Sequence, residues 1–477
     1  MILGKIQTLS DGERQQIHQA GIELLTSIGV RILSDKVLDM LEDAGVTVDR
    51  TAKTAVFTEQ MIDQCIKSVP AQFPLYDRAG QKEYLIGDRS PKYASGHNAI
   101  FMADPFTNER RYAKVKDIEE YTRIADSLAD IDIIGVPLNP QDVPSKSTLL
   151  HAMRALFTYT TKPLFFSTES RSVNAAIIEM MKATARDHNV RDYPSAISQL
   201  SPTSPLYWEK DAVEALVETS ESFVPLNILP EPISGLSAPY SVAGLLTIHN
   251  TEVLSGIVIS QIAAKGAPLL YGSSWTTYDM KYNSAIIGSP ETDLLRAAGC
   301  EMADYYGIPA HTTAPNTDAN AHDEQMAWEK ALSTMCAAGA RNDIIMNSGM
   351  FATGLSISHE QLVIDNEMNR YIKRISRGID VSSESINIES IKKVAHAGSY
   401  LMEEQTLDNL YGDEFFQYEI GTTANFDSWQ AAGAHDILQK ASAKVREILQ
   451  GSAHRYVDEQ QLTAIDHAIA AFEKENP

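Results

Sequence analysis

The sequence is poor in cysteine, and the few cysteines are scattered. Only Cys65, Cys300 and Cys336 occur in 477 residues, and no CxxC pair is present. An odd number without paired spacing argues against a disulfide framework and against a structural zinc site. We therefore expect a reducing compartment, with each thiol acting as a small buried hydrophobic group.

Long uninterrupted apolar runs are also missing. No stretch of about 18 consecutive apolar residues occurs, so no membrane-spanning helix is expected. The apolar segment 245–264 contains Asn250, Thr251 and Glu252 and predicts a buried helix instead. The first residues, MILGKIQTLSDGERQQ, lack the apolar core and cleavage site of a signal peptide. These absences predict a cytoplasmic protein.

Positively charged residues are also few relative to acidic ones. Lysine and arginine total 40 against 63 acidic residues, which gives a net charge of −23. Such a balance argues against nucleic acid or an anionic membrane as the main partner. Hydrophobic residues make up 44% of the chain, enough for a large core.

The common catalytic signatures are absent as well. The chain has no GxSxG, HExxH or P-loop motif, and no GxGxxG at a strand–helix junction. The candidate metal ligands His97, His311, Asp318 and His322 do not show a spacing diagnostic of zinc. We therefore predict no metal site.

Eight short apolar runs dominate what is present, and a stretch that can form a helix separates each from the next. They are 92–101, 131–139, 163–168, 194–202, 224–231, 268–275, 309–315 and 343–351. Strand–helix alternation indicates parallel strands joined by crossovers, and eight of them predict a (β/α)₈ TIM barrel with its active site at the carboxyl ends of the strands. We predict this α/β fold over 92–380, a helical and extended layer over 1–91, and a mainly helical extension over 381–477.

Capping signals support the helices between these strands. Ser10 with Glu13 and Asp117 with Glu120 have the spacing of capping boxes, and Ser289-Pro290 predicts a helix start. Beyond the barrel we expect three helices, over 386–397, 428–450 and 457–474.

Polar and aromatic residues gather at the predicted strand ends. They are Tyr93, His97, Asn98, Gln199, Asn227, Glu231, Tyr271, Trp275, His311, Gly349 and Phe351. The aromatic rings could form a cage for a quaternary ammonium group or could simply pack the barrel. Glu231, between two prolines, could be a general acid or base, could cap a neighbouring strand end, or could set the charge of the barrel mouth.

Four segments resemble the trimethylamine methyltransferase superfamily. They are SPTSPL at 201–206, PEPISG at 230–235, TDANAHDEQMAWEK at 317–330 and SISHEQLVIDNEMNRYIKRISRGI at 356–379. The similarity covers nearly the whole chain. Founding members carry pyrrolysine, whereas this chain shows only standard residues, so it resembles the non-pyrrolysine branch and, within it, the glycine betaine:corrinoid methyltransferases.

The resemblance implies a barrel that takes a methyl group from a quaternary amine, with glycine betaine giving dimethylglycine. The acceptor is the Co(I) of a corrinoid on a separate carrier protein. The chain lacks the D-x-H-x-x-G mark of a corrinoid-binding module, so we expect no tightly bound cofactor. We also expect a homo-oligomer.

Roles for individual residues follow from this implied reaction. The candidate donors to a substrate carboxylate are His97, Asn98, Gln199, Asn227, His311 and the N–H of Gly349. Ser201, Pro202, Ser204 and Gly235 are expected to face the corrinoid. The resemblance assigns no catalytic residue to this chain.

Three alternatives stay open on the sequence. A metal-assisted barrel lyase or hydrolase would use His97, His311 and Glu231. A non-catalytic protein would bind a quaternary amine without transferring its methyl group. Proline betaine or carnitine could replace glycine betaine, because all three share a methylated cationic head group.

Overall fold

A computed structural model describes residues 5–476 except 169, 186–188, 397 and 411. Its centre is a parallel sheet of eight strands in the order β6-β18-β17-β14-β13-β11-β10-β9. The strands are β6 (Lys92–Ser95), β9 (Ile134–Gly135), β10 (Leu164–Ser167), β11 (Ala196–Leu200), β13 (Leu226–Ile228), β14 (Leu269–Ser273), β17 (Ala310–Thr313) and β18 (Ile344–Ser348). A parallel bridge between Ala94 and Ile133 joins β6 to the segment entering β9 and closes the barrel. Each of the eight predicted runs contains one of these strands, so the predicted TIM barrel is confirmed.

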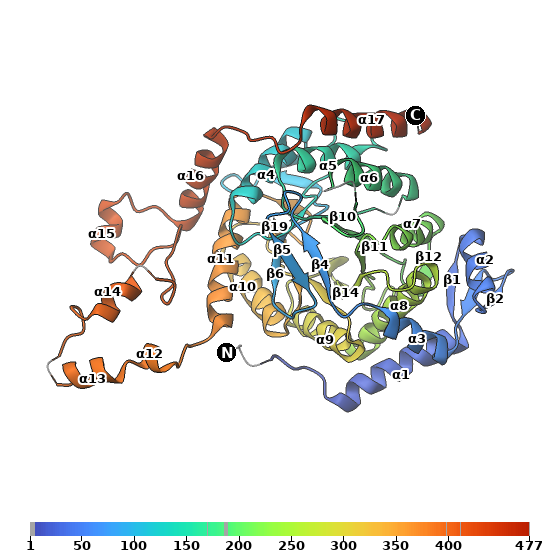
Figure 1. Ribbon diagram of the computed structural model, residues 1–477, viewed down its shortest axis with the longest axis horizontal. Helices are drawn as coiled ribbons and strands as arrows, with labels where there is room; N and C mark the ends of the chain where they lie inside the picture. The colour runs from blue at the N-terminus through green and yellow to red at the C-terminus, as the bar shows by residue number, and fades with distance from the viewer. Residues whose placement is uncertain (1–4, 169, 186–188, 397, 411, 477) are drawn as a thin grey trace.

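Eight helices surround the barrel, one after each strand (Figure 1). They are α4 (Val115–Ser127), α5 (Thr148–Tyr159), α6 (Arg171–Thr184), α7 (Lys210–Glu221), α8 (Val242–Ala263), α9 (Pro290–Tyr306), α10 (Glu324–Gly339) and α11 (His359–Arg377). The predicted start at Ser289 is confirmed, because its hydroxyl accepts the N–H of Thr292. The predicted cap at Asp117 is wrong. Asp117 lies inside α4, where its carboxylate accepts the N–H of Lys114 and pairs with Arg111.

Helix α8 is the one described helix long and apolar enough to span a membrane, with 72% of its apolar window buried inside the fold. Its apolar residues surround the helix instead of lining one face. The polar residues Asn250, Thr251 and Glu252 are all buried against neighbouring elements. This is the pattern of a core helix that contacts protein on every side.

Residues 5–90 form a layer on the outside of the barrel and close its amino end. The layer comprises α1 (Asp11–Ser27), β1 (Val30–Ile32), α2 (Asp35–Asp43), β2 (Thr47–Asp49), β3 (Thr54–Val56), α3 (Glu59–Ser68) and the hairpin β4 (Phe73–Tyr76) and β5 (Glu83–Ile86). The capping box at Ser10 is confirmed. Strand β1 pairs in parallel with β12 (Tyr207–Trp208), which follows barrel strand β11. Hairpin residues Phe73, Leu75 and Ile86 cluster with the apolar floor of the lumen.

Short strands extend from the carboxyl end of the barrel. Strands β7 (Phe101–Ala103), β8 (Arg110–Tyr112), β19 (Met350–Phe351) and β20 (Ser356–Ile357) form one small sheet, and β15 (Thr277–Asp279) and β16 (Ser284–Ile286) form a hairpin. These strands come from the connections that follow β6, β14 and β18. They therefore border the end of the barrel where the fold places an active site.

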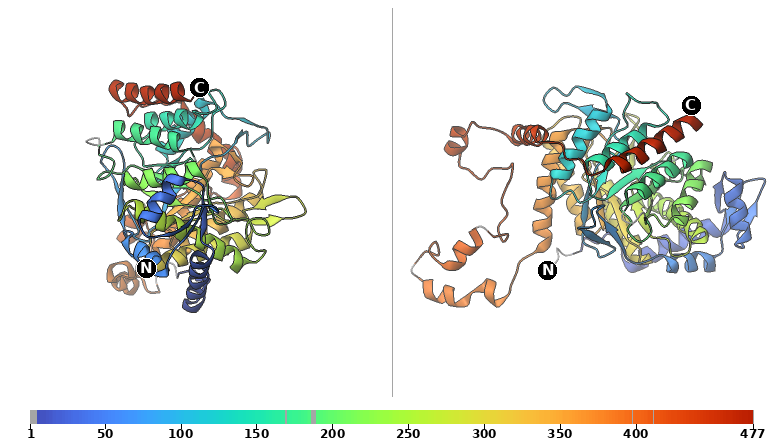
Figure 2. Two further views of the ribbon diagram at one scale, coloured as in Figure 1. Left: turned by 90° about the vertical axis from the view of Figure 1, so that its right-hand side faces the viewer. Right: turned by 45° about the horizontal axis from the view of Figure 1, so that its top comes forward.

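The carboxyl-terminal region is helical but more broken than the sequence predicts. It contains α12 (Ser383–Ile386), α13 (Ile388–Val394), α14 (Glu404–Leu410), α15 (Phe426–Ala431), α16 (Ile437–Gln450) and α17 (Glu459–Glu475). Asn387, in the left-handed region at φ 48°, separates α12 from α13, and Gly433 at φ 100° lies between α15 and α16. Residue 397, the expected end of the first helix, lies outside the described residues. Helices α12 to α15 extend away from the barrel, whereas α16 and α17 pack on its outer helices (Figures 1 and 2).

Candidate active site at the carboxyl end of the barrel

The lumen of the barrel changes from apolar to polar along its length. Its floor is built from alternate strand residues: Ala94, Ile133, Phe165, Ile197, Leu270, Ile344 and Met346. Toward the carboxyl ends the inward positions carry Gln199, Asn227 and His311. Side chains two residues apart on a strand point to the same face. Gln199 lies two residues after Ile197, so both side chains face the lumen.

Asn227 connects three strands in this polar layer. Its Nδ2 donates to Gln199 Oε1 at 3.2 Å and contacts His311 Nδ1 at 3.2 Å. An amide nitrogen can only donate, so Nδ1 of His311 is the acceptor and Nε2 carries the ring proton. The Asn227 side chain thereby fixes the tautomer of His311.

Polar atoms in this layer lack partners. Asn227 Oδ1, His311 Nε2 and His97 Nδ1 are buried without a hydrogen bond among the described residues. A Cβ on Gly272, an inward-facing residue of β14, would lie 2.7 Å from Asn227 Oδ1. The glycine therefore keeps open the space that this oxygen faces. Unsatisfied buried groups of this kind mark a place where a ligand can supply the missing bonds.

The two histidines are neutral. The ring of Phe165 lies 5.4 Å from that of His97 and is stacked on that of His311 at 5.2 Å. Burial lowers the pKa of His311 to about 3, with smaller contributions from His97 and Arg296, and burial also lowers the pKa of His97. At neutral pH the lumen thus presents imidazole N–H and amide groups without positive charge.

This burial predicts a loss of stability in acid. Below pH 6.5 the unfolded chain protonates His311, whereas the folded protein does not until about pH 3. The free energy of unfolding therefore falls as the pH drops below 6.5, by about 2 kcal/mol at pH 5 for this residue. Denaturant unfolding at pH 7.5 and pH 5.0 measures the difference. His311→Asn should reduce this pH dependence, and an identical dependence in that variant would show that His311 is not its source.

Negative charge lies at the barrel mouth. Glu231, just beyond β13, is exposed and accepts a hydrogen bond from Ser274 at 3.0 Å. The guanidinium of Arg296, on α9, is buried and donates to the carbonyls of Thr313 at 2.8 Å and Trp275 at 2.9 Å. Arg296 therefore ties together the carboxyl ends of β14 and β17, while Glu231 leaves a carboxylate at the rim.

Tyr93, Tyr271 and Trp275 do not converge in the lumen, so for these three rings the alternative that they pack the barrel is the correct one. All three are buried between the barrel and its helices, on the outer face of their strands. The hydroxyl of Tyr271 donates to Asn250 on α8 at 3.0 Å, and the ring of Trp275 packs 3.8 Å from that of His249. Alternation explains this arrangement, since the neighbours of Tyr271, Leu270 and Gly272, take the inward positions.

Two further candidates are engaged elsewhere. The N–H of Gly349 donates to Asp365 at 2.6 Å, so it is already occupied and the expected bond to a substrate carboxylate is not supported. Phe351 packs on His322 and borders a cavity of about 360 Å³ beside the β7–β8 hairpin. Asn98 is half-buried at φ 60°, three residues beyond β6.

The residues expected to face the corrinoid do lie on loops that follow β11 and β13. Ser201 is half-buried and Pro202 is buried. The hydroxyl of Ser204 is turned to α8, where it donates to the buried Glu252 at 2.7 Å. Gly235 is exposed at φ 78°. Their contact with a corrinoid stays a prediction.

Within the described residues, no group of three His, Cys, Asp or Glu side chains could hold a metal ion. Asp318, one of the candidate ligands, instead accepts the N–H groups of Ile287 and Gly288 at 3.0 and 2.8 Å. It therefore ties the loop before α9 to the loop after β17.

Sequence reasoning missed residues that shape the site from the helices. Arg296 lies within α9, and Lys330 on α10 pairs with Asp365 on α11 at 3.0 Å beneath the turn that follows β18. No strand-end pattern identifies them. The one sequence feature that could have indicated Arg296 and Lys330 is a charged residue within a helical stretch whose other face is apolar.

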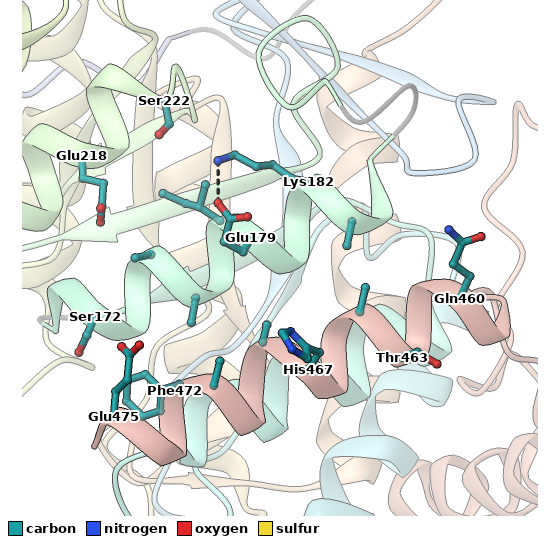
Figure 3. A pocket seen from close by; sticks show the side chains of 17 residues that line it. Ser172, Glu179, Lys182, Glu218, Ser222, Gln460, Thr463, His467, Phe472 and Glu475 are labelled. Carbon is teal, nitrogen blue, oxygen red and sulfur yellow. Dashed lines mark hydrogen bonds and ion pairs between the residues drawn. The ribbon is translucent and has the colours of Figure 1, made fainter. Parts of the chain in front are cut away.

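One cavity of the outer helical layer is remote from the mouth. A groove of about 1150 Å³ lies between α6 and α17, with Glu179, Lys182 and His467 along it (Figure 3). Many of its lining residues are alanines, and it lies on the outer surface of the helical layer. It does not contain any of the predicted site residues.

Comparison with known proteins gives one consistent family. The chain matches the family described as trimethylamine methyltransferase (MTTB) over residues 2–477. It is 30% identical over 442 residues to the trimethylamine methyltransferase MttB of Desulfitobacterium hafniense DCB-2, covering 92% of this chain and 89% of that one. It is 25% identical over 474 residues to the glycine betaine methyltransferase of D. hafniense Y51, covering 99% and 97%.

A solved structure supports the same fold. The monomethylamine methyltransferase MtmB of Methanosarcina barkeri superimposes with a TM-score of 0.50 at 12% identity, covering 99% of this chain and 95% of that one. At that identity the likeness concerns the fold alone. The match along residues 2–477 and the relatives at full length establish that this chain belongs to the trimethylamine methyltransferase (MTTB) family.

Proposed function

We propose that this methyltransferase moves a methyl group from a quaternary amine, in the first place glycine betaine, to the Co(I) of a corrinoid carried by a partner protein. The observation that carries the proposal is the neutral layer of Gln199, Asn227 and His311, with an acceptor at Asn227 Oδ1 and a donor at His311 Nε2 directed into the lumen. The glycine betaine methyltransferase among the relatives supports the choice of substrate.

The chemistry of the substrate explains why a neutral layer suffices. In the transfer, the N–CH₃ bond breaks with its electron pair going to nitrogen, and the electron pair of Co(I) forms the new C–Co bond. A quaternary ammonium group leaves as a neutral tertiary amine, so no proton has to be supplied. Amides and neutral imidazoles can position such a substrate, and the barrel can shield it from water.

The two ends of a betaine call for different partners. Its carboxylate needs N–H donors, and His311 Nε2 offers one inside the lumen. Its cationic head is attracted by the rim carboxylate of Glu231, and the neutral histidines of the lumen do not repel it. The positive charge of the substrate is lost in the transition state. A strong aromatic cage would therefore stabilise the bound substrate more than the transition state, and a weak attraction favours catalysis.

Substitution of Glu231 tests whether its carboxylate attracts the cationic substrate. We expect Glu231→Gln to raise KM for the cationic substrate several-fold and to leave kcat within about twofold, because the carboxylate attracts substrate and does not exchange a proton. Initial rates at low ionic strength measure both constants, and high salt should reduce the difference. A large fall in kcat that depends on pH would contradict this role and indicate a general acid or base.

Product formation tests the proposed reaction. Protein, reduced corrinoid carrier and one amine are incubated without oxygen, and proton NMR follows demethylation of glycine betaine, proline betaine, carnitine and trimethylamine in turn. Dimethylglycine from glycine betaine is the expected product. Turnover of another quaternary amine alone would correct the substrate, and turnover of trimethylamine alone would overturn the quaternary-amine proposal.

A further inference from the structure

The segment 379–412, which we call the arm, leaves the body after α11 and contains α12, α13 and α14 (Figures 1 and 2). Among the residues of the arm that the structure describes, ten large apolar side chains are exposed, including Leu401 at 75% and Met402 at 87%. Among the residues of the arm's three helices that the structure describes, only Val394 is buried.

The arm is held together by polar contacts. Ser390 on α13 donates to Glu403 at 3.2 Å, Lys393 pairs with the same carboxylate at 3.0 Å, and Gln405 on α14 donates to the carbonyl of Ser385 at 3.0 Å. Helices of four to seven residues are not stable alone in water and depend on tertiary packing. An element with polar ties inside and apolar side chains outside requires a partner to cover it.

The root of the arm is fixed to the body. Arg374 on α11 donates to the carbonyl of Glu414 at 2.9 Å, and Arg377 pairs with Asp413. The carboxylate of Glu367 accepts the N–H groups of Glu419 and Gly421, each at 3.1 Å. These contacts set the direction in which the arm projects, which favours a defined interface over a loose tether.

We propose that the arm packs against a second copy of this chain and forms the main contact of a homo-oligomer. The ten exposed side chains offer roughly 100 Å² each, or about 1000 Å² in total, comparable to the ~800 Å² per partner of a stable interface. A second copy is always present at equal concentration, so it is the kind of partner that can keep these side chains covered. An occasional partner would leave them in water between encounters.

The position and charge of the arm argue against the corrinoid carrier and against an anionic membrane as the partner that covers it. Arg377, at its root, lines a cavity together with Ser90 and Pro91, which precede β6, so the arm starts at the amino end of the barrel. A methyl acceptor is expected at the opposite end. The arm carries six acidic and two basic residues, a balance that disfavours an anionic membrane.

Light scattering after size-exclusion chromatography tests the proposal on the full chain. We expect a mass that is a whole multiple of 52.5 kDa. Leu401→Glu with Met402→Glu should weaken assembly at least 100-fold and give the 52.5 kDa monomer with an unchanged circular dichroism spectrum of the barrel. The matched control, Ile28→Glu with Tyr282→Glu, changes side chains of similar exposure outside the arm, 56% and 70%, and should keep the wild-type mass.

Hydrogen exchange provides a second readout that does not depend on a variant. In the assembled wild-type protein, amides of α13 and α14 should exchange at least 100-fold more slowly than in an unfolded chain, and dilution should remove this protection. A monomer at all concentrations, an assembled mass that survives the arm substitutions, or arm protection that appears only when a corrinoid carrier or anionic vesicles are added would overturn the proposal.

Discussion

Asn227→Ala is expected to lower kcat/KM for methyl transfer on the order of 100-fold while the barrel stays folded. The side chain joins β11, β13 and β17 through Gln199 and His311. Its removal frees the His311 ring to change tautomer and takes away the acceptor that faces Gly272. The substrate would then lose both an acceptor and the orientation of its N–H donor.

A second buried asparagine provides the control. Asn174 lies on α6, outside the barrel, and its Nδ2 donates to Thr219 at 3.1 Å. Both asparagines are fully buried. Asn174→Ala should therefore destabilise the protein to a similar extent but retain kcat/KM within a few-fold. Equal losses of activity in the two variants, or full activity in Asn227→Ala, would remove Asn227 from the site.

Lys330→Met is expected to lower the free energy of unfolding by about 3–5 kcal/mol. Lys330 is 1% exposed, lies 3.0 Å from Asp365, and donates to the carbonyl of Met350. Burial lowers the pKa of Lys330 and raises that of Asp365, and each charge offsets the shift of the other. Without the ammonium group, the carboxylate is left uncompensated in the interior and the turn at Gly349 loses its support.

Urea unfolding measures this loss, with an exposed ion pair for comparison. Lys182 pairs with Glu179 at 2.7 Å on the surface of α6, and Lys182→Met should cost less than about 1 kcal/mol. Lys330→Met combined with Asp365→Leu should recover part of the loss but not all of it, since Asp365 also accepts from Gly349 and Gln361. A cost below 1 kcal/mol for Lys330→Met would show that the buried pair does not stabilise the fold.

The barrel could be predicted because its signal is repeated and local. Each strand is a short apolar run, each helix has caps or an apolar stripe, and chain connectivity then leaves few topologies. The carboxyl-terminal helices were predicted less well. Asn387 and Gly433 adopt left-handed conformations that interrupt them, and the arm lacks a core that would impose one long helix.

The candidate site could be predicted only in part, for a reason of geometry. Strands buried on both faces read as continuous apolar runs, so the sequence does not reveal which alternate residues face the lumen. The polar residues Gln199, Asn227 and His311 occupy inward positions. Tyr271 lies one residue away from an inward position of β14, so its side chain faces α8. Arg296 and Lys330 act from helices through contacts that no local pattern encodes.

The anaerobic absorption spectrum of a Co(I) corrinoid carrier, recorded with this protein and glycine betaine, tests whether the protein transfers a methyl group from the betaine to cobalt. We predict loss of the Co(I) band and growth of methyl-Co(III), and both changes should require the protein and the betaine. An unchanged spectrum with every quaternary amine tried, from a carrier that accepts a methyl group from a known methyltransferase, would contradict it.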